Sequence, residues 1–366
     1  MIGGRGIPAT HGGVERAVEE LSVRLAERGH HVTVFCRNQY NPAREPEYRE
    51  VHLTYQPCIN TKHLEAITHT ALATLMGNLA GRFDIYHFSA TGPGLFSIVP
   101  RLLGRKSVVT VQGLDFQRSK WGKVARAFLR CCAHAVGSFP HETIVVSRKL
   151  QRYYQDRYGR KTTYIPNGVP PAELRPLPKD NRFQLEPGRY SLFLSRIVPE
   201  KGCHTLIKAY RQARTDFPLA ICGDPLHMDT YYRELRELAA GDGRVRFLGG
   251  VYGEDKENIF SSAALYVHPS DIEGLPISLL EAMSYGRAVL VSDIEENAEV
   301  LGSPPQAGRL FRCGDVDDLR DQLDSLLSDS DERERLGRLA LQRVRTEYDW
   351  ETITGRVEHL YERLLR

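Results

Sequence analysis

Two glutamates separated by seven residues, Glu273 and Glu281, occur in segment 269–293 (PSDIEGLPISLLEAMSYGRAVLVSD), with Gly274-Leu275-Pro276 between them. Gly274 lets the backbone turn and lets a ligand approach closely, and Pro276 suits the first turn of a helix. Either glutamate alone is equally well explained as a solvated surface carboxylate. The apolar sequence around them favours the alternative, because carboxylates in apolar settings usually have partners.

The residues after Pro276 predict a helix from about Ile277 to Tyr285, ended by Gly286. Its first turn would present free N–H groups and the positive end of the helix dipole, which suits a diphosphate. Glu281, on the helix, can accept hydrogen bonds from a vicinal diol such as a ribose. Glu273, on the preceding loop, can do the same for a sugar.

Two other segments have the composition of a phosphate site. SRIVPEKG (195–202) supplies two cations, Arg196 and Lys201, whose alternative interpretation is a solvated pair on a loop. The start of the chain, MIGGRGIPATHGGVE (1–15), is rich in glycine and precedes an apparent helix. Phosphate-binding loops usually have this composition.

Segment 269–293 resembles the E-x7-E motif of the retaining glycosyltransferases with two Rossmann-like domains (the GT-B type), specifically the large family-four group. Further segments resemble that family in order along nearly the whole chain: GGVE (12–15), IPNGV (165–169), SRIVPEKG (195–202), ICGD (221–224) and FLGGV (247–251). Any one segment is a weak signal, but the ordered set is specific.

The resemblance implies catalytic roles for Arg196, Lys201 and Glu273. The two cations would neutralise the donor diphosphate and the charge that builds on it as it leaves. Neither a divalent metal nor another cofactor is then required. Retention is expected through front-face attack, in which the leaving phosphate helps to deprotonate the acceptor, so no side-chain nucleophile is expected.

The resemblance also implies the residues that bind the donor, a nucleoside-diphosphate sugar linked to UDP or GDP. Glu281 would hold the ribose, and the backbone of Gly274, Leu275 and Pro276 would hold the sugar together with Glu273. The loop at Gly12 and Gly13 would close over the phosphates from the other domain.

The elements that position these residues follow from an alternating pattern of short β-rich runs and helical stretches, which predicts doubly wound parallel sheets. The pattern stops at a proline-rich stretch and then restarts. The fold class expected is α/β, with two Rossmann-like domains facing across a cleft and a C-terminal helix that crosses back to the first. The expected ranges are 1–168, a linker at 169–187, 188–345, and the returning helix at 346–366.

Composition excludes several classes of protein. A formal net charge of +3 over 366 residues is too small to indicate a nucleic-acid partner. The chain has no apolar run long enough to span a membrane and no apolar signal segment at its start. The seven cysteines lack CxxC spacing, which fits reduced thiols in a cytosol better than disulfides or a zinc site. We expect a cytoplasmic protein.

One position departs from the family pattern. Many relatives have His-Gly after the strand that ends in VVTV, whereas this chain has Gln112 and Gly113. Gln112 can still form a hydrogen bond with a sugar hydroxyl, but it cannot carry a proton as histidine does. The donor sugar is therefore uncertain.

The stretch 117–136 is amphipathic and lacks acidic residues. The pattern places Trp121, Val124, Ala125, Phe128 and Cys132 on one face and Lys120, Lys123, Arg126 and Arg130 on the other. A domain helix with a solvated basic face is one interpretation. The other is a surface that docks on anionic lipid at the inner membrane face, where relatives that extend lipid-linked glycans act.

The function expected is transfer of a hexose-type sugar to a hydroxyl of a glycan or lipid-linked glycan, in cell-surface polysaccharide or glycolipid synthesis. The alternatives are a nucleotide-sugar 2-epimerase of the same fold and a non-catalytic nucleotide-sugar-binding partner. The base, sugar, acceptor, linkage and oligomeric state do not follow from the sequence. Because Met1-Ile2 can supply only a stub of the strand that normally precedes such a glycine loop, we expect the natural chain to begin upstream.

Overall fold

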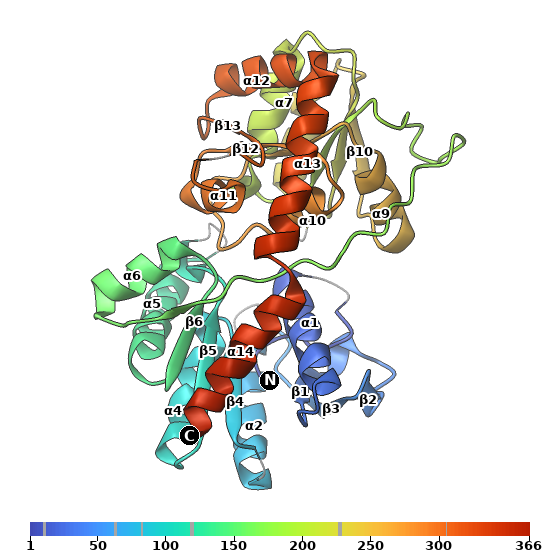
Figure 1. Cartoon of the computed structure of the whole chain (residues 1–366). Coiled ribbons are helices and arrows are strands. Elements are labelled where there is room, and N and C mark those ends of the chain that lie inside the picture. Colours follow the sequence, from blue (N-terminus) through green and yellow to red (C-terminus); the bar gives the residue numbers. More distant parts are fainter. Residues whose placement is uncertain (10–11, 62–63, 82, 118–120, 226–228, 305) are drawn as a thin grey trace. The chain divides into compact units, whose positions relative to one another are not determined.

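The computed structural model describes residues 1–9, 12–61, 64–81, 83–117, 121–225, 229–304 and 306–366. The chain forms two compact units (Figure 1): unit 1 is Met1–Gly168 with Trp350–Arg366, and unit 2 is Val169–Asp349. The division after Gly168 coincides with the boundary expected from the sequence. The returning segment begins at Trp350, so residues 346–349 stay with unit 2.

Unit 1 has parallel strands in the order β4-β5-β6-β7, and a second group in the order β1-β3-β2, in which β2 pairs antiparallel with β3. Met1-Ile2 lies between the two groups: Ile2 bridges Phe88 of β4, and the Phe35 N–H of β1 donates to the Met1 carbonyl at 3.0 Å. The elements are α1 (Gly13–Glu27), β1 (Thr33–Arg37), β2 (Glu47–Tyr48), β3 (Val51–Gln56), α2 (Glu65–Ala80), β4 (Ile85–Ser89), α3 (Thr91–Gly94), α4 (Ile98–Leu102), β5 (Lys106–Val111), α5 (Lys123–Ser138), β6 (Glu142–Val145), α6 (Arg148–Tyr158), β7 (Thr163–Tyr164) and α14 (Trp350–Leu365), with short 3-10 turns at Asn38–Tyr40, Leu95–Ser97 and Asp115–Gln117.

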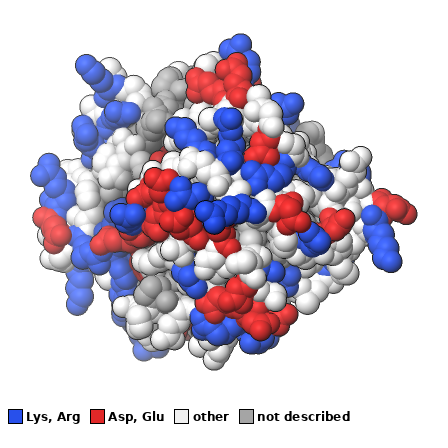
Figure 2. Space-filling model, turned by 90° about the horizontal axis from the view of Figure 1, so that it is seen from above, with Lys and Arg blue, Asp and Glu red and all other residues white. Residues whose placement is uncertain are grey.

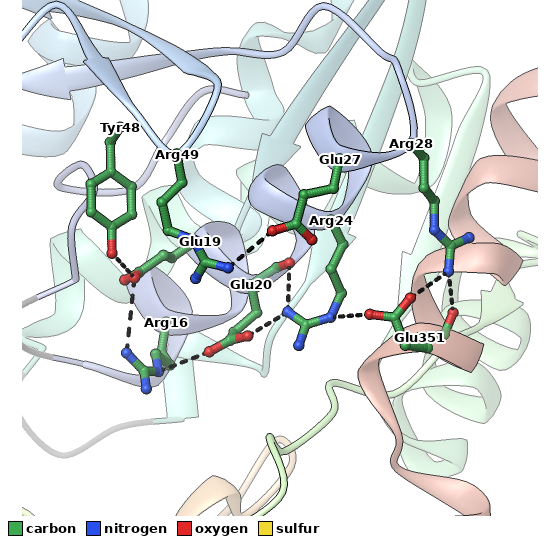
Figure 3. A network of polar contacts seen from close by, with 9 residues as sticks. All are labelled: Arg16, Glu19, Glu20, Arg24, Glu27, Arg28, Tyr48, Arg49 and Glu351. Carbon is green, nitrogen blue, oxygen red and sulfur yellow. Dashed lines mark hydrogen bonds and ion pairs between the residues drawn. The ribbon is translucent and has the colours of Figure 1, made fainter.

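The last helix, α14, lies beside α1 in unit 1 (Figure 1). Its apolar stripe is buried against α1 and the sheet, as the helical spacing predicts: Trp350, Ile353, Val357, Leu360 and Tyr361. Ion pairs link the exposed side of the same two helices (Figure 3). Apolar packing and ion pairs therefore both hold α1, the helix that follows the glycine-rich loop, against α14.

Unit 2 is a six-stranded parallel sheet in the order β10-β9-β8-β11-β12-β13, with a continuous apolar core that includes Phe193, Leu206, Leu265 and Leu290. The strands and helices restart where the sequence pattern restarts. They are β8 (Ser191–Leu194), a 3-10 turn at Pro199–Lys201, α7 (Cys203–Gln212), β9 (Leu219–Cys222), α8 (Asp229–Leu238), β10 (Val245–Gly249), α9 (Gly253–Ser262), β11 (Leu265–His268), α10 (Ile277–Ser284), β12 (Ala288–Ser292), α11 (Glu295–Leu301), β13 (Arg309–Phe311), α12 (Val316–Ser328) and α13 (Ser330–Glu347).

Segment 169–187, expected as a linker, packs on unit 2. The backbone N–H groups of Arg175 and Leu177 donate to the hydroxyls of Ser261 and Ser262 at the end of α9, at 2.9 and 2.8 Å. Leu177, Phe183 and Leu185 are buried. Proline limits regular secondary structure in this segment. Its backbone N–H groups at Arg175 and Leu177 are satisfied by the two serine hydroxyls, and its buried apolar side chains hold it on unit 2.

The faces expected for α5 also need correction. Cys132 is buried together with Leu129, Ala133 and Val136, but Val124 is 85% exposed and Phe128 is exposed as well. The core side is therefore set by the second half of the helix, where it packs against α3. Of the 117–136 stretch, residues 118–120, which include the predicted Lys120, lie outside the described residues.

Surface charge is mixed. On the face shown in Figure 2, lysine and arginine side chains are interspersed with aspartate and glutamate. No helix within the described part of the chain is long and apolar enough to cross a bilayer.

Candidate active site

The strand order of unit 2 defines where its ligand site should lie. From β8 the chain moves outward to β9 and β10, and then returns to the other side of β8 for β11, β12 and β13. The order reverses between β8 and β11. In open α/β sheets, ligands bind at the carboxyl ends of the strands at such a reversal.

Three predicted or neighbouring side chains meet at that point. Lys201 follows β8, His268 is the last residue of β11, and Glu273 lies on the loop after β11. The Lys201 ammonium donates to Glu273 Oε1, and His268 Nε2 lies 2.7 Å from the same oxygen. All three side chains are nearly buried, so these contacts form away from bulk water.

Electrostatics keep this carboxylate charged. Burial by itself would raise the pKa of Glu273, but the charge of Lys201 and the contact with His268 hold that pKa well below its usual range. Burial lowers the pKa of His268 against the opposing effect of Glu273, so the imidazole is neutral. A neutral ring that donates from Nε2 to Glu273 accepts at Nδ1, and the Tyr266 hydroxyl lies 3.1 Å from that nitrogen.

Two glycines let the loops approach closely enough for these contacts. Gly202, directly after Lys201, has φ +67°, and a Cβ there would lie 2.0 Å from the carbonyl oxygen of Pro269. Gly223, after β9, has φ +151°, and a Cβ there would lie 1.8 Å from the carbonyl oxygen of Ser195. Neither position has room for a side chain, so backbone packing fixes the loops after β8, β9 and β11 against one another.

The E-x7-E segment folds as the sequence predicts. Helix α10 runs from Ile277 to Ser284, with Pro276 as its N-cap residue and Gly286 in the left-handed region at φ +67°. Gly274, Leu275 and Pro276 are buried at its start. Glu281 on α10 forms an ion pair with Lys256 of α9 at 2.7 Å, so the second glutamate also has a cationic partner.

The edge of the sheet near β9 and β10 carries a further polar group. Asp224 follows Gly223, accepts a hydrogen bond from the Tyr252 hydroxyl and packs against Gly250, where a Cβ would lie 2.6 Å from the Asp224 carboxylate. Arg196, after β8, is exposed. Among the described residues, no group of three or more His, Cys, Asp or Glu side chains is arranged to hold a metal.

The predicted residues Gly12, Gly13 and Gln112 belong to unit 1. Gly12 is the N-cap residue of α1 at φ +90°, and Gly13 begins the helix. Two carboxylates of α1 hold the described part of the loop: Glu15 accepts from the N–H of Arg5 at 3.3 Å, and Glu19 accepts from the N–H of Ala9 at 2.7 Å. Positions 10 and 11 of the loop lie outside the described residues.

Glu19 is part of a larger network on α1 (Figure 3). It accepts from the Tyr48 hydroxyl at 2.9 Å, and Arg16 lies within ion-pair distance of both Glu19 and Glu20. Arg24 then connects Glu20 to Glu351 of α14. The loop is therefore attached to α1, and α1 is itself held by Tyr48 of β2 and by Glu351 of α14.

Gln112 follows β5 and pairs with Asn167 of the IPNGV segment. The Asn167 amide donates to the Gln112 oxygen at 2.6 Å, and the Gln112 amide lies 3.3 Å from the Asn167 oxygen. Both amides line a pocket of unit 1 together with His87, Thr110 and Trp350. Its departure from the family pattern made Gln112 a candidate, but the sequence alone gives no hydrogen-bond partner for it.

The sequence pattern assigns no role to His268 or Lys256. His268 ends the apolar run ALYVH (264–268), and a polar residue at the carboxyl end of an apolar strand is a usable signal for a site. Lys256 gave no such signal, because its contact with Glu281 depends on the packing of α9 beside α10.

Comparisons with known proteins agree with this geometry. Residues 179–343 match the family Glycosyl transferases group 1, and residues 11–173 match Glycosyltransferase Family 4. The chain is 29% identical to a phosphatidyl-myo-inositol mannosyltransferase of Mycolicibacterium smegmatis, over 96% of this chain and 90% of that protein. It is 31% identical to O-antigen chain mannosyltransferase B of Escherichia coli, over 71% of this chain and 61% of that protein.

The fold has solved counterparts. Sucrose-phosphate synthase from Thermosynechococcus elongatus superimposes with a TM-score of 0.80 at 24% identity, over 96% of this chain and 94% of that one. Both halves of the chain thus match one enzyme class in sequence, and its doubly wound units match that class in fold. The chain belongs to the family-four glycosyltransferases of the GT-B fold, enzymes of glycan and glycolipid synthesis.

Proposed function

We propose that this protein transfers a hexose from a nucleoside-diphosphate sugar to a hydroxyl of a glycan or lipid-linked glycan, with retention and without a metal ion. The observation that carries the proposal is the meeting of Lys201, His268 and Glu273 at the strand-order reversal of unit 2. A fixed cation and a fixed carboxylate beside a helix N-terminus suit a diphosphate and a sugar.

The cationic and the acidic residues of the site have different roles. Arg196 and Lys201 face the diphosphate and stabilise the charge that develops on it. Glu273 and the backbone of 274–276 hold the sugar ring. The bond from the anomeric carbon to the diphosphate breaks, the acceptor oxygen bonds to the same face of that carbon, and its proton passes to the leaving phosphate.

Glu281 binds the ribose of the donor. Lys256 of α9 holds the Glu281 carboxylate in position through their ion pair. UDP and GDP are the bases to test. Mannose is the first sugar to test, because both curated relatives described above are mannosyltransferases. The Gly12-Gly13 loop and Gln112 of unit 1 complete the donor and acceptor contacts in this proposal.

A donor panel with and without acceptor tests the proposal. UDP- and GDP-linked hexoses are incubated with a lipid-linked oligosaccharide, and the anomeric configuration of the product is read by NMR. Retention supports the proposal, and an inverted product contradicts the mechanism. A new nucleotide sugar formed without acceptor identifies an epimerase. Donor binding without turnover on any acceptor identifies a non-catalytic partner.

Activity is expected to persist in EDTA. Arg196 and Lys201 supply the positive charge that a divalent ion supplies in other transferases. Transfer rates measured before and after chelation should agree. Turnover that disappears in EDTA and returns with magnesium or manganese would contradict the metal-free mechanism.

A charge-neutral variant of the 117–136 stretch tests peripheral membrane binding through its basic residues Lys120, Lys123, Arg126 and Arg130. Each cation near an anionic surface contributes about 1 kcal/mol. The wild-type protein should co-sediment with anionic vesicles less as salt rises, and the variant should bind more weakly at low salt. Equal binding of both proteins would leave α5 as an ordinary domain helix.

A further inference from the structure

Asn167 forms a reciprocal pair with Gln112 at the carboxyl ends of three parallel strands of unit 1. Gln112 follows β5, Asn167 lies shortly after β7, and β6 separates these two strands in the sheet. The Asn167 amide donates to Gln112 Oε1 at 2.6 Å, and the Gln112 amide donates to Asn167 Oδ1 at 3.3 Å. Each side chain is therefore both donor and acceptor toward the other.

This reciprocal pairing fixes the orientation of the Gln112 amide. If Gln112 turned over alone, its nitrogen would face the Asn167 nitrogen and its oxygen would face the Asn167 oxygen, so both hydrogen bonds would be lost. A glutamine side chain has two N–H groups and two acceptor lone pairs. The pair uses one of each, which leaves one N–H and one lone pair of Gln112 for another partner.

The two residues differ in what they can reach. Asn167 is 6% exposed, whereas Gln112 is only partly buried. Pro166 restricts the backbone beside Asn167, and the N–H of Ile165 donates to the carbonyl of Val145 at 3.1 Å, so this segment is held on the sheet. Ordering a long glutamine side chain costs conformational entropy, and a fixed partner reduces that cost. Asn167 is thus the fixed member of the pair, and Gln112 is the member that a ligand can contact.

The surroundings of the pair are uncharged at neutral pH. Both amides line a cavity between the sheet and helices α1 and α14, and the described residues that line it include no aspartate, glutamate, lysine or arginine. Its titratable groups are His87 of β4 and the Met1 amino group. Burial lowers the pKa of His87 to about 3 and the pKa of the Met1 amino group to about 5, so both are neutral at pH 7. An ionised group placed beside Gln112 would therefore find no counter-charge among these residues.

We propose that Asn167 is a positioning residue, which holds the Gln112 amide in the orientation in which it meets a sugar hydroxyl. A hydroxyl can accept from the remaining N–H of Gln112 or donate to its remaining lone pair. Transfer depends steeply on such placement, because a substrate held slightly out of line reacts more slowly. The inference rests on the proposed function in one respect, that Gln112 contacts the sugar.

A purely structural role for Asn167 predicts a different result. Loss of the pair would then lower the stability of unit 1, and any effect on transfer would not depend on the residue at position 112. A positioning role acts through Gln112, so it disappears when Gln112 is absent.

The test is a double-mutant cycle on kcat/KM in the full chain, with Q112A, N167A and Q112A/N167A. Loss of a neutral hydrogen bond to a sugar hydroxyl is expected to lower kcat/KM about tenfold in Q112A. N167A should lower it about fivefold, because Gln112 is then present but not held. The double variant should match Q112A within about twofold. A loss of about fiftyfold in the double variant, the product of two independent effects, overturns the proposal, as does an unchanged kcat/KM in N167A.

N167D adds a pH signature that a structural role would not give to transfer. An ionised aspartate has no proton to donate, so the Gln112 oxygen loses its donor, whereas a protonated aspartic acid supplies an O–H in its place. Burial raises the pKa of such a carboxyl group above its ordinary value. The ratio of kcat/KM in N167D to that in the wild type should therefore rise as the pH is lowered from about 8 to about 5.5.

N78D is the matched control for this pH profile. Asn78 of α2 donates to the carbonyl of Thr74 at 2.7 Å, and the activity ratio of N78D to the wild type should not change with pH. A flat activity ratio for N167D overturns the proposal.

Thermal unfolding of the same variants separates this inference from the proposed function, because it does not require turnover. If the pair exists, N167D gains stability relative to the wild type as the pH falls, since its folded state binds the proton more tightly than its unfolded state. Rising stability beside a flat activity ratio shows a structural role and overturns the proposal. A wild type that transfers no sugar contradicts the proposed function and with it any role of Asn167 in transfer, while the unfolding profile still shows whether the pair exists.

Discussion

Lys201→Ala is expected to lower kcat about a hundredfold or more while the donor KM changes little. The departing diphosphate carries more charge in the transition state than in the bound donor, so the lost cation matters more during transfer than during binding. Steady-state kinetics with the preferred donor measures both constants. If the donor KM rose and kcat stayed level, the cation would be assisting binding alone.

The structure adds a control for this experiment. Lys201 is also the partner of Glu273, so its removal leaves a buried carboxylate with only the His268 contact to offset its burial. The double variant Lys201→Ala/Glu273→Gln removes that uncompensated charge. Because Glu273 itself holds the sugar, the double variant is compared with Glu273→Gln alone. If Lys201 acts on the diphosphate, the double variant has a lower kcat than Glu273→Gln. Equal kcat values would show that Lys201 acts only through the carboxylate.

Gly202→Ala is expected to destabilise unit 2 by about 3 kcal/mol and to reduce transfer as well. The new Cβ would overlap the carbonyl oxygen of Pro269, which lies 2.0 Å away, so the loops after β8 and β11 must separate. Lys201 is adjacent and would be displaced from Glu273. The melting temperature should fall by roughly 6–12 °C.

Gly286→Ala is the matched control, because Gly286 has the same φ of +67° and lies in the same unit. A Cβ there would meet only Leu341 at 3.8 Å and the carbonyl oxygen of Gly337 at 3.9 Å, which are ordinary contacts. Its cost should be about 1 kcal/mol, the strain of the left-handed backbone alone. Equal shifts in the two variants would show that the contact with Pro269 relaxes freely.

The sequence was sufficient for much of the fold. The alternation of short β-rich runs and helical stretches predicted the parallel α/β architecture of both units. The helical spacing of Trp350, Ile353 and Val357 likewise matches their burial. Those features are local, because the order of apolar and polar residues along a strand or helix reflects which of its faces is buried. Glu273 and Lys201 could be proposed because each lies in a short segment that resembles the family.

Features that depend on packing between elements could not be predicted. Val124 of α5 fits a helical stripe with Cys132, yet only the second half of that stripe faces the core. Thr70 and Thr74 are buried because their hydroxyls bond within α2, and the residue pattern alone would have placed Leu75 inward instead. Lys256 meets Glu281 across two helices, and such a pair leaves no spacing to detect.

Unit 1 is built from two segments of the chain that are separated by all of unit 2, Met1–Gly168 and Trp350–Arg366. The buried stripe of α14, which includes Trp350, Ile353 and Val357, completes the apolar core of unit 1. Because a chain is made from its N-terminus onward, that part of the core stays uncovered until unit 2 has been synthesised. Unit 2 can therefore complete its core first, and unit 1 completes its own last.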